Sequence, residues 1–344
     1  MVYGSVCSGI EAASVAWKHL GWRCAFVSET DKFPSAVLAH RFPEVPNLGD
    51  FTAIEGNDYA GQIDLLVGGT PCPSFSRAGR GEGLTDERGG LALAFAKLAH
   101  DSCVRWLVWE NVTDVLPCHG GADFAALLTL FVGWDVTVPN GKWRRSGILT
   151  GAPGHFSVGW RVLDTRYTRV EQFPRGIPQR RRRILLIGYR GNARRVAEVL
   201  FGGELCGGRT PPLREDEADG PRTVAASAAK VCIPVDLMNV IGREKHLKGK
   251  GWDENESASY TITKRYSPGV CDGSTVRHFT PRECERLMGL PDDWTLVPYR
   301  GRPAELCKDR PRYKAIGNSM PVNLMMWIGE RINEVETYGH VKNR

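Results

Sequence analysis

The sequence of 344 residues has no Cys-x-x-Cys pair, although ten cysteines are scattered along it. Without such pairs the cysteines indicate neither a zinc ribbon nor a dithiol redox site, and no metal is expected. No apolar run approaches the length needed to cross a bilayer, and no secretory leader is evident at the start. The irregular cysteine spacing and the missing leader predict a reducing, cytoplasmic location.

Internal repeats and low-complexity tracts are also missing. An apolar content of 42% and a charged content of 24% are ordinary for a globular protein. The length is sufficient for a sizeable core and two lobes. The net charge of +6 is mild, so it fits a polyanionic partner without requiring one.

Short apolar runs alternate with helix-like segments in the first half of the chain. Strands are predicted at Val2–Cys7, Cys24–Glu29, Ile63–Val67, Arg105–Trp109 and Arg183–Tyr189, and helices at Glu11–Leu20, Phe33–His40 and Leu91–His100. This alternation is typical of an α/β fold with a mostly parallel sheet and helices on both faces.

The periodicity weakens from about Arg190. Glycine pairs, a proline pair and an acidic run interrupt residues 190–276, which predicts a separate, smaller lobe that is β-rich or irregular. A disordered insert is the alternative, but Val231–Ile233 and Tyr260–Ile262 are typical of strands. Regular structure returns at Thr280, and Pro321–Val335 predicts a last amphipathic helix.

Cys72 lies between two prolines directly after the apolar run Leu65–Val67. The run predicts a buried strand, so the thiol sits where a strand ends, which is where open α/β sheets bind ligands. Prolines stiffen the backbone on both sides of the sulfur. A thiol positioned in this way is a candidate nucleophile. The alternative is that Cys72 is a small buried apolar residue, as most free cysteines are.

Two further polar groups adjoin predicted strands. Glu110 follows the strand Arg105–Trp109, and in an apolar site its pKa would rise, which would let it donate a proton near neutral pH. A surface acid at a strand end is the simpler interpretation. The run Gln179–Arg183 precedes another strand, so Arg181 and Arg183 should point one way and Arg180 and Arg182 the other. A solvated basic patch is the alternative there.

The start of the chain has the pattern of a nucleotide-type cofactor site. A glycine turn at Gly9 leads into a helix, and Glu29 follows about twenty residues later, where an acid can bond ribose hydroxyls. Asp50 and Phe51 add an acid and an aromatic suited to an adenine. Because the full glycine triplet of dinucleotide sites is missing, this signal is weak by itself.

The segment Arg77–Gly90 is rich in glycine and arginine. Such a loop is suited to closing over a polyanion and shielding the chemistry from water. An ordinary surface loop is the alternative.

Together these features resemble the cytosine-C5 DNA methyltransferase family of prokaryotes and phages. The resemblance covers nearly the whole chain outside about residues 190–276. The segments that support it are Thr70–Ser76, Glu110–Val112, Gln179–Arg183, Phe279–Pro291 and Tyr313–Val322, which occur in the family's order.

The resemblance implies a Rossmann-like fold and a mechanism. Cys72 matches the nucleophile that attacks C6 of cytosine, and Glu110 matches the acid that protonates N3. Arg183 matches the arginine that holds the cytosine O2, and Arg181 supports it. Methyl transfer from S-adenosylmethionine to C5 then follows, on a base flipped out of duplex DNA.

The resemblance also implies the binding positions. Residues that match the cofactor pocket are Cys7, Gly9, Ile10, Glu29, Thr30, Asp50, Phe51, Pro71, Leu91, Asn318 and Met320. Residues expected to contact DNA are Ser76, Arg77, Arg80 and Arg88. Because Asn318 belongs to the pocket, the last helix should fold back onto the first lobe.

The chain departs from the family pattern in its first motif. The family usually has Asp-Leu-Phe and more glycines there, whereas this chain has Ser5–Cys7 and then Glu11–Ala12. An aromatic stacking partner for adenine is therefore missing at that point.

The domain organisation follows from the same comparison. Residues 1–189, completed by 310–336, are expected to form the catalytic domain that binds S-adenosylmethionine. Residues 190–309 are expected to form the target-recognition lobe and its return connection. The protein is expected to act on double-stranded DNA as a monomer in the cytoplasm of a bacterium or a phage-infected cell, without contact with a membrane. A restriction endonuclease encoded separately is a possible partner.

Three alternatives remain at the level of sequence. One branch of the family acts on transfer RNA, so the substrate could be RNA. A catalytically inactive DNA-binding protein is disfavoured by the retained Cys72, Glu110, Arg181 and Arg183. A nicotinamide-type oxidoreductase fits the alternating sheet but leaves the cysteine between prolines and the arginine run unexplained.

Overall fold

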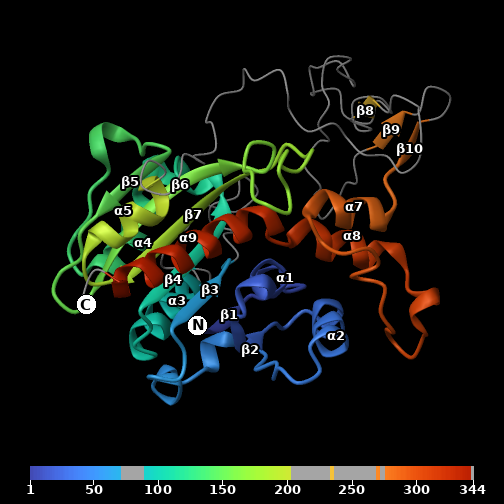
Figure 1. Ribbon diagram of the computed structural model, residues 1–344, viewed down its shortest axis with the longest axis horizontal. Helices are drawn as coiled ribbons and strands as arrows, with labels where there is room; N and C mark the ends of the chain where they lie inside the picture. The colour runs from blue at the N-terminus through green and yellow to red at the C-terminus, as the bar shows by residue number, and fades with distance from the viewer. Residues whose placement is uncertain (71–88, 203–232, 236–268, 272–275, 342–344) are drawn as a thin grey trace.

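A seven-stranded sheet forms the centre of the computed structural model, which describes residues 1–70, 89–202, 233–235, 269–271 and 276–341 (Figure 1). The order of its strands is β2-β1-β3-β4-β7-β6-β5. Their bounds are β1 Val2–Val6, β2 Arg23–Ser28, β3 Leu65–Gly68, β4 Trp106–Val112, β5 Ser146–Leu149, β6 Phe156–Asp164 and β7 Arg182–Arg190.

The sheet is mostly parallel, as predicted. Strands β1 to β4 pair in parallel, whereas β7 pairs antiparallel with both β4 and β6, and β5 pairs antiparallel with β6. Strand β6 therefore runs in the same direction as β1 to β4, and only β5 and β7 oppose them. Reversal of β7 brings the end of β4 next to the start of β7.

Helices cover both faces of the sheet because its central strands carry apolar side chains on both faces. In β4, Trp106 and Val108 join one buried cluster together with residues of α1, α5 and α9, and Leu107 and Trp109 join another with residues of α3 and α4. The helices span α1 Ala12–Trp17, α2 Lys32–Arg41, α3 Gly89–Asp101, α4 Ala122–Val132, α5 Ala193–Phe201, α7 Pro281–Met288, α8 Asp309–Asn318 and α9 Val322–Val341. Helices on both faces are thus confirmed.

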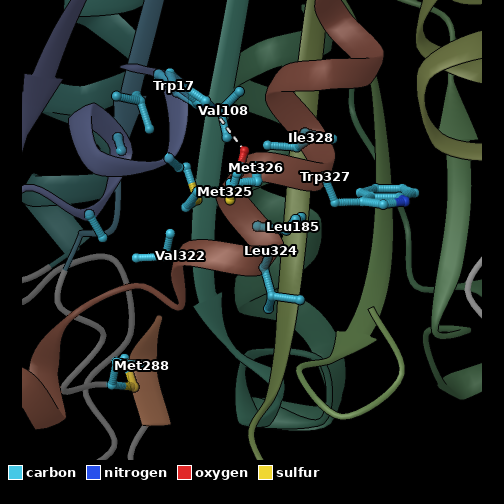
Figure 2. Close-up of a cluster of buried hydrophobic side chains, with 14 of the residues drawn as sticks. Trp17, Val108, Leu185, Met288, Val322, Leu324, Met325, Met326, Trp327 and Ile328 are labelled. Atoms are coloured by element: carbon cyan, nitrogen blue, oxygen red, sulfur yellow. Dashed lines mark hydrogen bonds between the residues drawn. The ribbon is translucent and has the colours of Figure 1, made fainter. Parts of the chain in front are cut away.

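Helix α9 returns the end of the chain to the first lobe (Figures 1 and 2). Leu324, Met325 and Met326 are fully buried, and the indole Nε1 of Trp17 donates a hydrogen bond of 2.7 Å to the carbonyl of Met325. Figure 2 shows this bond within the apolar cluster that includes Val108 and Leu185 of the sheet. The expected return of the last helix is therefore present.

Several elements match their prediction closely, and others were not foreseen. The first helix continues through a 3-10 turn at Lys18–Leu20 and ends at Gly21, whose φ of 67° suits glycine. Helix α4 and strands β5 and β6 were not foreseen. Strand β8, Ile233–Val235, overlaps the predicted run Val231–Ile233. The predicted strand at 260–262 lies outside the described residues.

Helix α5 lies beyond the predicted lobe boundary at residue 190 and packs on the sheet, and the boundary itself stays a prediction. In α5, Val196, Val199 and Leu200 are fully buried in the same cluster as the sheet residues. Phe279 and Met288 join that cluster from the C-terminal side of the predicted lobe. Between them the structure describes β8, β9 (Gly269–Cys271) and β10 (Val276–His278), which form a small antiparallel sheet. Among the described helices, none is both long and apolar enough to cross a membrane.

Candidate active site

A small hollow, open to solvent, lies at the carboxyl ends of β1, β3 and β4. Its walls come from the end of β1 and the turn after it, from Gly69 and Glu110, and from the segment Asn318–Met320. Ligands bind at this edge of open α/β sheets. The hollow thus brings the candidate acid Glu110 together with four predicted cofactor positions, which are Cys7, Gly9, Asn318 and Met320.

Glu110 is buried and faces a cation. The Nε atom of Arg183 lies 3.0 Å from Oε1 of Glu110. This is a close charge contact without the alignment of a hydrogen bond, since Oε1 has no aligned donor. Burial raises the pKa of Glu110 above its ordinary value, and the positive charges of Arg183 and Arg181 oppose that rise. The raised pKa agrees with the role of proton donor that the sequence suggested.

The antiparallel pairing of β4 with β7 explains why these two side chains meet. Val112 lies opposite Arg183 in the ladder. Glu110 is two residues from Val112 and therefore projects on the same face, diagonally across from Arg183.

The predicted alternation is present at Arg181, Arg182 and Arg183, whereas the side of Arg180 stays a prediction. Arg181 is 2% exposed, and its Nη2 donates to the carbonyls of Gly317 at 3.0 Å and Ser319 at 2.7 Å. Arg183 is half-buried beside Glu110, whereas the exposed Arg182 contacts Asp164 on the other face. Arg181 thereby fastens the segment that forms one wall of the hollow.

Two side chains of β4 hold the residue that precedes the cysteine loop. The indole of Trp109 donates to Oγ1 of Thr70 and the amide of Asn111 donates to its carbonyl, each at 3.0 Å. Both project on the face opposite to Glu110, since side chains alternate along a strand. Pro71, Cys72, Ser76, Arg77, Arg80 and Arg88 lie outside the described residues. Their roles stay predictions.

The first turn is organised by a carboxylate. Gly9 has a φ of 56°, and its N–H donates to Oε2 of Glu29 at 2.8 Å. Oε1 of the same carboxylate accepts from the N–H of Asp31 at 2.7 Å. Glu29 therefore lies directly against the predicted cofactor turn.

Asp50 lies close to the same place. Its Oδ1 accepts from the N–H and the hydroxyl of Thr52, both at 2.9 Å. Burial, followed by the charges of Glu29 and Asp50, raises the pKa of the Cys7 thiol to about 12. The two carboxylates and the thiol are thus neighbours. Phe51, which is 5% exposed, belongs to the buried cluster against which Cys7 packs.

Six predicted cofactor residues do not line the hollow, and besides Glu29, Asp50 and Phe51 these are Ile10, Thr30 and Leu91. Ile10 is fully buried in the core, and only its carbonyl is used, by the indole of Trp294. Thr30 is exposed at the end of β2, and Leu91 packs partly against the core from α3. Their assignment stays a prediction.

Glu11 is a wall residue whose role sequence reasoning missed. It is 1% exposed and has a φ of 59°, which is unusual for a residue other than glycine. Its carboxyl accepts from the hydroxyl of Ser5 at 2.8 Å and from the N–H and hydroxyl of Ser14 at 3.2 and 3.0 Å. Burial still raises the pKa of Glu11 to about 7. The available signal was an acid in a motif that usually contains glycine.

Comparisons with known proteins agree on one family. A family model described as C-5 cytosine-specific DNA methylase matches residues 1–134 and 218–334. The Type II methyltransferase M.DsaV of Dactylococcopsis salina is 26% identical over 94% of this chain and 84% of its own length. The Type II methyltransferase M.SsoII of Shigella sonnei is 27% identical over 89% of this chain and 73% of its own.

A further relative has a different name. The DNA N-6-adenine-methyltransferase of Escherichia phage P1 is 31% identical over 97% of this chain. The chain spans only 61% of the length of that relative. Among solved structures, the S. pombe Dnmt2 methyltransferase aligns with a TM-score of 0.63 at 14% identity, covering 98% of this chain and 99% of its own. This likeness shows the fold.

Proposed function

The chain belongs to the C-5 cytosine-specific DNA methylase family, and we propose that it is a DNA cytosine-5 methyltransferase whose reaction takes place in the hollow beside Glu110. One observation supports this site above the others. The same hollow is lined by the buried acid Glu110 and by the predicted cofactor positions Cys7, Gly9, Asn318 and Met320. A methyl donor bound there would therefore be adjacent to a base held by Glu110.

The proposed chemistry begins with the Cys72 thiolate, which adds to C6 of the flipped cytosine. Glu110 gives its proton to N3 as the ring accepts the electron pair, and Arg183 holds O2. C5 would then take the methyl group from the sulfonium of the donor, which would leave as a thioether, while the N3 proton returns to Glu110. Loss of the C5 proton to solvent would re-form the C5–C6 double bond and expel the Cys72 sulfur as a thiolate. Only a protonated Glu110 can begin this sequence, so its raised pKa supports the assignment.

Membership of this family implies S-adenosylmethionine as the methyl donor, and residues that line the hollow or lie beside it fit this donor. When bound, the donor supplies an electrophilic methyl group on a sulfonium. Glu29 is placed to accept from ribose hydroxyls, since its carboxylate contacts the turn at Gly9. Asp50 is placed to accept from the adenine amine, because only its Oδ1 is used by Thr52. Glu110, whose Oε1 is paired with Arg183, completes the lining of the hollow at the place proposed for the base.

The target-recognition region, the substrate, the oligomeric state and the DNA contacts are also part of the proposal. We assign target recognition to the region between α5 and β10, and duplex DNA as the substrate. We expect the protein to act as a monomer in the cytoplasm, alongside a restriction endonuclease if one is encoded. The expected DNA contacts of Ser76, Arg77, Arg80 and Arg88 belong to the same proposal.

The decisive experiment measures which nucleoside receives the methyl group. The protein is incubated with labelled S-adenosylmethionine and with mixed-sequence duplex DNA or transfer RNA, and the products are digested and separated. We expect label in 5-methylcytosine from DNA. Label in N6-methyladenine alone, as the name of the phage P1 relative describes for that protein, would overturn the proposal, and label only in transfer RNA would change the substrate.

Two variants test the assigned roles. Duplex DNA containing 5-fluorocytosine should trap a covalent complex that Cys72→Ala does not form. Glu110→Gln should lower the rate of methyl transfer by about 10²–10⁴-fold, the range typical of a lost general acid. Glu198→Gln on α5 removes a carboxylate far from the chemistry and should retain the wild-type rate. Trapping by Cys72→Ala would show that the nucleophile is assigned wrongly.

A further inference from the structure

Three metal-binding side chains converge beyond the end of β4, outside the hollow described above. Cys118 and His119 lie in the 3-10 turn Cys118–Gly121, and Asp123 lies in the first turn of α4. One donor atom of each residue lies within 4.8 Å of the other two. Sulfur, imidazole nitrogen and carboxylate oxygen are the three donor types that zinc prefers in proteins.

The geometry is that of donors around a common point. Nδ1 of His119 lies 2.6 Å from Oδ2 of Asp123 and 3.9 Å from Sγ of Cys118. A Cys-His-Asp catalytic triad needs the two ring nitrogens of histidine to face different partners. Here the same nitrogen faces both, so a proton relay through the ring is excluded. Bond lengths of about 2.0–2.3 Å place the ligands of one tetrahedral zinc roughly 3.3–3.6 Å apart. A bound ion would therefore draw Sγ of Cys118 closer to Nδ1 of His119, and it would separate Nδ1 from Oδ2 of Asp123, which are at hydrogen-bond distance without it.

The backbone holds this arrangement in place. His119 has φ 47° and ψ 44°, a left-handed conformation that residues other than glycine rarely adopt, and Gly120 and Gly121 continue it. The indole of Trp143 donates a hydrogen bond of 2.8 Å to the carbonyl of Gly121. A Cβ on Gly121 would lie only 2.8 Å from the same ring, so turn and ring are packed tightly. Strained residues of this kind cluster at functional sites.

Exposure at the cluster suits a metal site with one open position. The side chain of Asp123 is 9% exposed, whereas that of His119 is 36% exposed. The carboxylate of Asp123 is thus fixed against the protein while solvent reaches the ring of His119. Water is the usual fourth ligand of zinc where the protein supplies three.

We propose that Cys118, His119 and Asp123 form a zinc site with water as the fourth ligand. The expectation of no metal rested on the missing cysteine pairs. This site instead uses one cysteine, the histidine next to it and an acid four residues after that histidine. The turn begins eight residues after Glu110. A bound ion would therefore fasten the segment that joins the strand of the catalytic acid to α4.

Cobalt provides the test, since it replaces zinc and its bond to a thiolate has a distinctive charge-transfer absorption. The full chain without a polyhistidine tag is freed of metal with a chelator, in the Cys72→Ala background so that the nucleophile does not bind the ion. We expect one cobalt per chain with a thiolate band, displaced by one equivalent of zinc. Cys118→Ser should abolish the band, and Cys103→Ser, at an exposed cysteine outside the cluster, should retain it.

His119→Gly separates ligation from folding. Glycine adopts the left-handed backbone without strain, so this variant should melt no lower than its parent. Its zinc affinity should nevertheless fall by more than roughly tenfold, which is the loss expected when a residue that only hydrogen-bonds to a ligand is removed. Asp123→Asn should weaken zinc in the same way. The proposal is overturned if no thiolate band appears, if the band persists in Cys118→Ser, or if His119→Gly and Asp123→Asn bind zinc as tightly as the parent.

Discussion

At the scale of single residues, two buried acids show how environment decides protonation. Glu110 loses water and faces Arg183, so burial and charge act in opposite directions on its pKa. Glu11 loses water and gains only neutral hydrogen bonds from Ser5 and Ser14. Hydroxyl and amide donors compensate for the lost hydration of a carboxylate less than an adjacent cation would. Burial therefore dominates the pKa of Glu11.

We predict that Glu11 makes the stability of the protein depend on pH. Its pKa is about 7 in the folded protein, against an ordinary value of 4.5. The folded state therefore binds this proton more tightly than the unfolded state does. The resulting stability is fully present below about pH 4.5 and is lost as the pH rises to about 7, by about 3 kcal/mol in total. Denaturant unfolding measured from pH 4.5 to pH 8 detects this loss.

Glu11→Gln should remove that dependence. The amide can still accept from the N–H of Ser14, so the variant should match the wild type at pH 4.5 and exceed its stability at pH 8. Glu198→Gln serves as the control for loss of one carboxylate. Equal losses of stability in wild type and Glu11→Gln between these pH values would contradict the assignment.

At the scale of elements, Arg181 joins the start of β7 to the turn between α8 and α9. Its Nη2 donates hydrogen bonds to the carbonyls of Gly317 and Ser319, which flank Asn318 in the wall of the hollow. Because Nη2 lies farther along the side chain than the Nζ of a lysine reaches, lysine cannot reproduce both bonds.

We expect Arg181→Lys to cost about 1.5–3 kcal/mol of stability, the range for hydrogen bonds to charged groups. Binding of S-adenosylmethionine should weaken as well, because Asn318 and Met320 would lose their support. Denaturant unfolding and calorimetric titration measure the two effects. Arg182→Lys, on the exposed face of the same strand, is the matched control. An unchanged cofactor affinity in Arg181→Lys would show that the segment is held by other contacts.

Packing of α9 on α1 depends on a glycine. A Cβ at Gly329 would lie 2.3 Å from Nε1 of Trp17, a fully buried ring that cannot move aside. Gly329→Ala should therefore destabilise the protein by about 1–3 kcal/mol. Gly90→Ala in α3 meets open space and should stabilise by about 0.5–1 kcal/mol. Urea unfolding compares the two, and a Gly329→Ala variant as stable as the wild type would mean that α9 is packed differently.

At the scale of the whole molecule, the net charge of +6 favours a polyanion. We predict that the affinity for duplex DNA falls with salt, with a log–log slope of about −0.9 per phosphate contacted. Arg80→Ala should weaken binding to all sequences and make the slope shallower by about one contact. Binding titrations at several salt concentrations measure both. If the affinity of the wild type for duplex DNA did not change with salt, nucleic acid would be excluded as the partner.

Much of the fold was predictable because its signals are local. The apolar runs at Val2–Cys7 and Leu65–Val67 correspond to β1 and β3, and the helix before Gly21 ends where a left-handed glycine stops it. The segment from α4 to β6 was not predictable in this way. Helix α4 is apolar on nearly all sides, with Phe124, Leu128 and Phe131 buried, so it lacks the one-sided pattern that identifies a surface helix.

The sequence by itself determined the alternating strands and helices, the cysteine between prolines and the acid at the end of β4, because strand periodicity and turn chemistry are set by neighbouring residues. Only the tertiary structure decided that β7 runs antiparallel to β4 and brings Arg183 to Glu110, and that Arg181 holds the wall at Asn318. It also decided the raised pKa of Glu11 and the meeting of Cys118, His119 and Asp123. The pairing of distant strands, burial, and the folding of a turn into a left-handed conformation arise from packing, which local sequence patterns do not specify.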